Sequence, residues 1–179
     1  MSVSRNRAAQ RLEELRDSFD SSFSRPPPPQ KDPGEALLRL RVGGTPLMVR
    51  LGHLSGLHLM PRVVRLPGSP ASLLGVVGLR GQLIAVHDLA ALLGLPVGEP
   101  PRWLLLAGGA RRVGLAASGF DGQLRATQEQ MKGGGGSSAV HPLLSASVVL
   151  PDSPPVPVLD VDALVRKLLE DAALQQGRG

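Results

Sequence analysis

Residues 75–94, with the sequence GVVGLRGQLIAVHDLAALLG, carry the signal that decides the fold. The apolar runs 75–79 and 82–86 have the length and the Val and Ile content of short β-strands. Arg80 and Gly81 separate the two runs, so we interpret the segment as a strand that ends in a turn and is followed by a second strand. The rest of the sequence bears on why a charge is kept between two apolar strands.

The same pattern of short strands and turns extends along residues 35–160. Residues 36–51 alternate apolar side chains with arginines around a Gly-Gly-Thr-Pro turn, which is typical of a β-hairpin with one face in the core. Gly or Pro lies in nearly every gap between the strands. This pattern favours an all-β barrel or sandwich over a parallel sheet with crossover helices. Further strands are expected at 56–60, 62–66, 103–107, 112–117 and 148–150.

Two helices interrupt the strands. Asp88 precedes the apolar residues 89–93, and Gly94 follows them, which predicts a short helix with an Asp cap. Residues 160–177 repeat this pattern at greater length and predict a C-terminal helix. Between the two helices, the glycine-rich residues 130–142 are expected to be mobile.

The N-terminal region differs in composition from the rest. Residues 4–23 place Ala8, Leu12, Leu15, Phe19 and Phe23 at spacings of three and four, which predicts an amphipathic helix. This helix is a candidate partner-binding element, and the alternative is that it packs on the protein's own barrel. Four consecutive prolines then predict an extended linker.

These patterns divide the chain into three parts. We expect an N-terminal helix and linker over 1–34, a globular domain over 35–165, and a helix end and tail over 166–179. The globular domain is expected to contain two β-subdomains, at about 35–95 and 100–160, because an Asp-capped apolar helix follows each half.

Composition limits the function classes. The chain has 179 residues, no Cys, 2% aromatic residues and a formal net charge of +5. The lack of Cys excludes disulfides and thiol chemistry. Dispersed basic residues with few aromatic rings do not favour nucleic-acid binding. No signal peptide and no apolar run of about 18 residues occurs, so we expect a cytoplasmic protein without membrane insertion.

The candidate catalytic residues are few. His87 and Asp88 are adjacent, as in some metal-dependent phosphohydrolases, but such sites need further ligands, and Asp88 is also expected to cap a helix. His53 and His58 lack the spacing of a metal pair. The run after Lys132 lacks the order of residues of a phosphate-binding loop. A binding module without metal or cofactor is therefore favoured, and a phosphohydrolase that uses His87 and Asp88 is the alternative from another class.

Four segments of the sequence resemble CheW-like domains, in the family's order. They are LRLRVGGTPLMVRLGHLSGL (38–57), RLPGSPASLLGVVGLRGQLIAVHDLAALLGL (65–95), WLLLAGGARRVGLAASGF (103–120) and VPVLDVDALV (156–165). The second segment is the most specific, since the Leu-Pro-Gly-Ser-Pro turn, the Leu-Arg-Gly motif and the step into the helix fall at the family's spacing. The resemblance covers about residues 36–165.

The resemblance implies a mainly β fold of two small SH3-like β-barrel subdomains around a shared hydrophobic core. It also implies a non-catalytic adaptor, without a cofactor, that binds the cytoplasmic tip of chemoreceptors and couples them to a CheA-type histidine kinase. By position, Arg80 and Gly81, with Leu79, inherit the receptor-facing role of the family's Leu-Arg-Gly segment. Val49 and Leu54 match hydrophobic binding positions of the first subdomain.

Three positions depart from the family pattern. Gly78 replaces the usual Asn before Leu-Arg-Gly, Ser118 occupies a commonly acidic position, and residues 53–59 lack a frequent Glu. These changes bear on kinase coupling more than on the fold. The alternative function is therefore a paralogue that binds receptors without coupling the kinase, for example in a gliding-motility (Frizzy-type) chemosensory pathway.

Two interpretations of Arg80 follow. Either it pairs with a carboxylate of a helical receptor tip, with apolar neighbours adding contact area, or it forms an internal ion pair that holds the two subdomains together. Gly75, Gly78 and Gly81 are expected to shape the strands around it through bulges or close backbone contacts.

Overall fold

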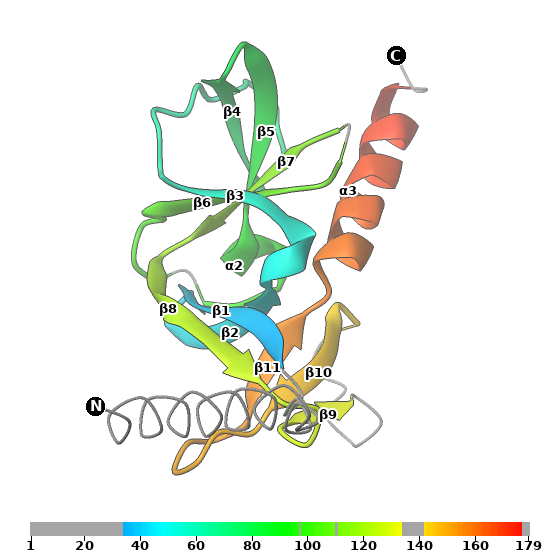
Figure 1. Ribbon diagram of the computed structural model, residues 1–179. Helices are drawn as coiled ribbons and strands as arrows, with labels where there is room; N and C mark the ends of the chain where they lie inside the picture. The colour runs from blue at the N-terminus through cyan, green and yellow to red at the C-terminus, as the bar shows by residue number, and fades with distance from the viewer. Residues whose placement is uncertain (1–33, 97, 110, 134–141, 177–179) are drawn as a thin grey trace, which may run out of the picture. The chain divides into compact units, whose positions relative to one another are not determined.

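The computed structural model describes residues 34–96, 98–109, 111–133 and 142–176. The expected N-terminal helix over 4–23 and its proline linker lie outside these residues. Residues 34–179 form one compact unit by themselves. Figure 1 shows that this unit consists mainly of β-strands, with helix α3 along one side. None of the described helices is long and apolar enough to cross a membrane.

The first sheet has six strands in the order β8-β1-β2-β11-β10-β9. β1 and β2 form the expected hairpin, in which Val42 lies opposite Thr45 across a turn of Gly43 and Gly44. β2 and β11 are parallel, so a strand from the C-terminal part of the chain pairs with the first hairpin of the described residues. The strands are β1 (Glu35–Val42), β2 (Thr45–Arg50), β8 (Gly119–Ala126), β9 (Met131–Gly133), β10 (Leu144–Val148) and β11 (Val156–Leu159).

The second sheet has five strands in the order β3-β6-β7-β5-β4. β4 and β5 are the two apolar runs on either side of Arg80, and they pair in antiparallel fashion. β5 also pairs with β7 in parallel, so both β5 and β7 are interior strands. The strands are β3 (Leu54–Leu59), β4 (Leu73–Leu79), β5 (Gln82–Asp88), β6 (Trp103–Ala107) and β7 (Val113–Ala117).

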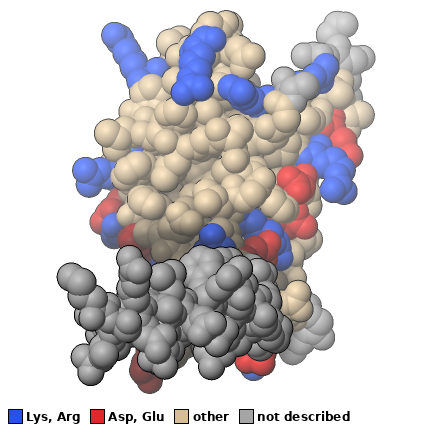
Figure 2. All heavy atoms as spheres, in the orientation of Figure 1, with Lys and Arg blue, Asp and Glu red and all other residues tan. Residues whose placement is uncertain are grey.

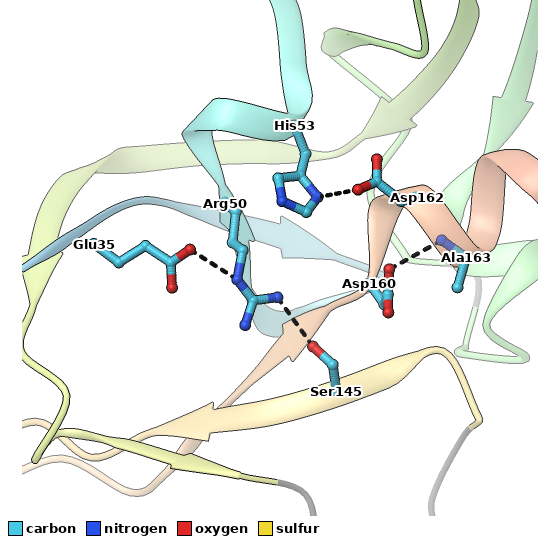
Figure 3. Close-up of polar contacts among 7 residues, drawn as sticks. All are labelled: Glu35, Arg50, His53, Ser145, Asp160, Asp162 and Ala163. Carbon is cyan, nitrogen blue, oxygen red and sulfur yellow. Dashed lines mark hydrogen bonds and ion pairs between the residues drawn. The ribbon is translucent and has the colours of Figure 1, made fainter.

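The helices begin where the sequence predicts. Asp88 caps the short helix α2 (Leu89–Leu92), since its Oδ1 accepts a hydrogen bond of 2.8 Å from the Ala90 N–H. Asp160 caps α3 (Val161–Gln176) in the same way, and accepts 2.9 Å from the Ala163 N–H (Figure 3). A 3-10 turn, η1 (Leu51–His53), joins β2 to β3.

Three apolar clusters hold the two sheets. Leu104 and Leu106 of β6 belong to a cluster within the five-stranded sheet. Leu105 and Ala107 point the other way, into a cluster shared by both sheets, because side chains alternate along a strand. A strand buried on both faces explains why residues 103–107 read as one continuous apolar run. The shared core includes Leu40, Val42, Leu47, Val49, Leu89, Leu105, Leu115, Leu159, Val161 and Leu164.

The predicted class is confirmed: the chain is mainly β, with two β-subdomains around a shared core and with helices. The edge strands of neither described sheet pair with each other, so the sheets are not closed barrels. The expected bounds of the two subdomains, about 35–95 and 100–160, do not match the sheets. Residues 35–50 pair with strands from 119–159, while 54–117 form the other sheet, so the division at 95–100 is wrong as a subdomain boundary.

Three local expectations also need correction. The strand expected at 148–150 lies earlier, because β10 ends at Val148. Residues 62–66 do not form a strand, and only Val64 makes an isolated bridge, to Val76. Within 130–142, expected to be mobile, residues 131–133 form strand β9, which pairs with β10. Residues 134–141 lie outside the described part of the chain.

Candidate functional site

The β4–β5 hairpin presents Arg80 at its tip. Leu79 lies opposite Gln82, so Arg80 and Gly81 form a two-residue turn. Their φ angles are +49° and +77°, as a type I′ turn requires. This turn matches the right-handed twist of paired strands but favours Asn and Gly, and a side chain such as that of Arg costs about 1 kcal/mol in the left-handed region.

Arg80 is exposed and makes no ion pair or hydrogen bond with the residues that the structure describes. An internal ion pair between the subdomains, the second interpretation of Arg80, therefore finds no partner in the described part of the chain. A strained turn that carries an unpaired charge contributes nothing evident to folding. Such positions are the ones at which a functional role is worth testing.

The neighbours of Arg80 play different roles. Leu79 is half-buried and packs against the core of its own sheet, so only part of its surface is open to a partner. Leu83, which the sequence analysis did not single out, is 82% exposed. The alternation of side chains along β5 could have predicted this exposure. Ile84 and Val86 point inward, so Leu83 must point outward.

The backbone explains why a glycine occupies position 75. Gly75 lies at an irregularity in the β4–β5 register, with φ +141°. A Cβ at this position would approach the Val64 carbonyl oxygen to 2.1 Å. Gly78 has no such constraint, since a Cβ there would have nothing within 4 Å among the described atoms. Gly78 is therefore not needed for the local backbone, whereas Gly75 is.

The two hydrophobic positions expected in the first subdomain do not join the hairpin. Val49 is fully buried in the shared core, so its assignment as a binding residue is wrong. Leu54 is partly buried against the same core, at the start of β3. β3 and β4 are opposite edges in the strand order, and the structure does not bring Leu54 together with Arg80.

His87 and Asp88 do not form an evident catalytic pair. The Asp88 carboxylate is engaged with the start of α2, as expected. Burial lowers the pKa of His87 below its ordinary value of 6.5, and its Nδ1 has no hydrogen-bond partner among the described atoms. The described residues contain no cluster of three His, Cys, Asp or Glu side chains that could hold a metal. The described geometry therefore lends the phosphohydrolase alternative no support.

Ser118, which the resemblance placed at a commonly acidic position, serves the fold. It is buried, and its Oγ–H donates a hydrogen bond of 2.8 Å to the Arg41 carbonyl oxygen. The Arg41 guanidinium pairs with Asp121 at 2.9 Å. Both contacts tie the start of β8 to β1, so this departure from the family pattern has a structural explanation.

Charge is distributed unevenly over the two sheets. Residues 54–117, which span the five-stranded sheet, contain six arginines but only two acidic residues, Asp88 and Glu99. Figure 2 shows Lys and Arg but no Asp or Glu around the upper end, where Figure 1 places the β4–β5 hairpin. All six side chains are exposed and unpaired among the described residues: Arg62, Arg65, Arg80, Arg102, Arg111 and Arg112. A field of this kind attracts acidic partners.

Comparisons with known proteins agree with this architecture. Residues 36–169 match the family model of the CheW-like domain. A probable chemotaxis protein CheW from Rhizobium etli is 31% identical over 96 residues, which cover 52% of this chain and 62% of that protein. The chain thus aligns with less than two thirds of the relative's length.

A solved structure extends the comparison to the fold. The crystal structure of the scaffolding protein TtCheW from Thermoanaerobacter tengcongensis superposes with a TM-score of 0.63 at 12% identity. The superposition covers 70% of this chain and 88% of that one. The superposition shows that the two chains share a fold.

Proposed function

Since the chain belongs to the CheW-like domain family, we propose that it is a non-catalytic adaptor of a chemosensory array that binds chemoreceptor tips through the β4–β5 hairpin. The observation that carries this proposal is Arg80, an exposed and unpaired cation among the described residues at a strained two-residue turn. Leu79 and Gly81 accompany it as the remaining contacts of the turn.

The chemistry of the surface supports an acidic, helical partner. An exposed Arg beside apolar side chains is a common anchor in protein interfaces. The surrounding unpaired arginines add long-range attraction for carboxylates. The adaptor then acts in the cytoplasm, where receptor tips and a CheA-type kinase are found together, and it couples the two.

A receptor-only paralogue is the second candidate. Gly78 stands where the family usually has Asn, although the structure imposes no need for Gly there. Ser118 replaces an acidic side chain and is used within the fold. The absence of an Asn side chain at position 78 and of an acidic side chain at position 118, without a change of fold, supports weakened kinase coupling. An origin in a gliding-motility, Frizzy-type pathway remains a prediction.

The test of the receptor contact is the variant Arg80→Asn. Asn suits a type I′ turn, so the variant removes the charge and keeps the hairpin. We expect receptor affinity to fall by about thirtyfold, equivalent to about 2 kcal/mol, in a pulldown with receptor cytoplasmic fragments. The melting temperature should stay equal or rise slightly.

Arg65→Glu is the matched control, since Arg65 is also exposed and unpaired among the described residues. It should weaken binding much less than Arg80→Asn. Unchanged receptor binding by Arg80→Asn would remove the hairpin from the contact. Co-purification of the kinase, measured separately with the wild-type chain and with Gly78→Asn, distinguishes the full adaptor from the receptor-only paralogue.

A further inference from the structure

A groove of about 620 Å³ lies between β5 and the C-terminal half of α3. One wall consists of Leu168 and Leu169 of α3, and the other includes Leu83 and His87 of β5, with Arg111 and Arg112 before β7. We call this the β5–α3 groove. It is separate from the turn at the hairpin tip, because Arg80 does not line it.

The groove has a mixed lining, in which leucines from β5 and α3 lie beside polar side chains such as Gln82 and His87. Leu83 is 82% exposed and lies opposite Gly78, whose missing side chain leaves Leu83 uncovered on that side. Leu168 and Leu169 are only partly buried against the shared core. Exposed leucines beside a concave surface are costly in water unless a partner covers them.

The shape of the groove limits how a partner can bind. β5 pairs with β4 and β7, and β7 pairs with β5 and β6, so the strands at the groove have no free edge. A bound peptide cannot add a strand there. It must bind through side chains, and a helix with one apolar face is the form that fits a groove in this way.

The charges of the groove lining favour an acidic helix over a basic one. The lining of the groove contains no carboxylate, whereas Arg111 and Arg112 belong to the lining, are exposed and are unpaired among the described residues. Glu170 and Asp171 of α3 do not line it. We propose that the β5–α3 groove is a docking site for an acidic amphipathic helix, with the apolar face of the helix on Leu83, Leu168 and Leu169 and its carboxylates at Arg111 and Arg112.

This site goes beyond the proposed receptor contact and does not depend on it. The hairpin tip offers a single Arg on a turn, whereas the groove combines three leucines with two arginines in its lining. An adaptor with both surfaces can hold two helical segments at once, either from one partner or from two.

The experiment uses the full-length chain and two synthetic helical peptides of about 18 residues with Leu at the i, i+3, i+4 and i+7 positions. One peptide carries Glu at its flanking positions, and the other carries Lys at the same positions. Fluorescence anisotropy should show binding of the Glu peptide that is about tenfold tighter than that of the Lys peptide. Leu83→Lys and the double variant Arg111→Glu, Arg112→Glu should each weaken the Glu peptide by about tenfold.

Leu59→Lys and Arg65→Glu are the matched controls, because Leu59 is 70% exposed and both residues lie outside the groove. The controls should bind the Glu peptide as the wild type does. Absence of binding, or equal loss in the controls and the groove variants, overturns the proposal. Light scattering of the wild type and of Leu83→Lys measures the oligomeric state. If the wild type were a dimer and Leu83→Lys a monomer, a second copy of the chain would fill the groove, and the proposal would also be overturned. Arg80→Asn should leave binding of the Glu peptide unchanged. A failure of the groove proposal can therefore be told apart from a failure of the receptor proposal.

Discussion

The two sheets use their charges differently. In the six-stranded region, the Arg50 Nε lies 2.9 Å from the Glu35 Oε1, and the Arg41 Nε lies 2.9 Å from the Asp121 Oδ1. A polar contact of 2.9 Å also joins His53 Nδ1 of η1 to Asp162 Oδ2 at the start of α3 (Figure 3). The arginines of the five-stranded region have no such partners among the described residues. In the six-stranded region, Arg41 and Arg50 join segments through ion pairs, whereas the arginines of the five-stranded region are exposed and unpaired among the described residues.

This difference separates stability from recognition. Exposed like charges repel one another and do not favour the compact state. The five-stranded region must therefore be held by its apolar core and by close backbone packing, as at Gly75. Residues that bind a partner can then be changed there at little cost to folding, whereas charge changes in the other region should reduce stability.

The largest effect should come from Gly75→Ala, which tests whether the five-stranded region depends on backbone packing. The new Cβ would lie 2.1 Å from the Val64 carbonyl oxygen, at a φ of +141°. We expect a loss of about 3 kcal/mol in the free energy of unfolding, measured by urea denaturation. Gly78→Ala is the control and should change stability by less than about 0.5 kcal/mol. Equal losses in both variants would contradict the argument.

An intermediate effect is expected for Arg50→Met, which tests the paired charges. Arg50 donates a hydrogen bond of 3.1 Å to Ser145 Oγ in addition to its pair with Glu35 (Figure 3). Because its side chain is only 21% exposed, we expect a loss of about 1.5 kcal/mol in the free energy of unfolding. Arg65→Met, which breaks no contact in the described structure, should change it by less than about 0.5 kcal/mol. If the two variants lost the same amount, the contrast between the regions would fail.

The smallest effect concerns pH and His87. Burial lowers the pKa of this side chain below its ordinary 6.5. As pH falls through the ordinary value, the unfolded chain binds a proton that the folded chain does not, so stability decreases toward acid. Because the ring is partly exposed, solvent screening should keep this loss below about 1 kcal/mol.

His87→Gln should reduce the difference in urea midpoint between about pH 7.5 and pH 5.5. His58→Gln in the same sheet is the control. An unchanged pH dependence in His87→Gln would show that other groups cause the acid response.

Much of the local structure could be predicted from neighbouring residues. The hairpin at Gly43 and Gly44, the turn at Arg80 and the caps at Asp88 and Asp160 all follow from preferences within a few positions. Family membership, predicted from four ordered segments, is confirmed. The receptor-facing role of Arg80 stays a prediction.

The assignment of Val49 failed for a physical reason. It lies in β2, whose residues are buried on both faces by clusters that contain strands from distant parts of the chain. A sequence pattern shows that Val49 is apolar but does not show whether its face meets a partner or the protein's own core. The exposure of Leu83 depends in the same way on Gly78 in the paired strand.

The sequence by itself determined the first hairpin, most strands of the five-stranded sheet, the helix caps and the family, because the local elements depend on backbone preferences and on alternation between adjacent residues. Only the tertiary structure decided which strands share a sheet, since the parallel pairs β2–β11 and β5–β7 join segments that are far apart in the chain. It also decided which arginines are paired and where a groove is left between β5 and α3. These properties depend on side chains that meet only after distant segments have packed together.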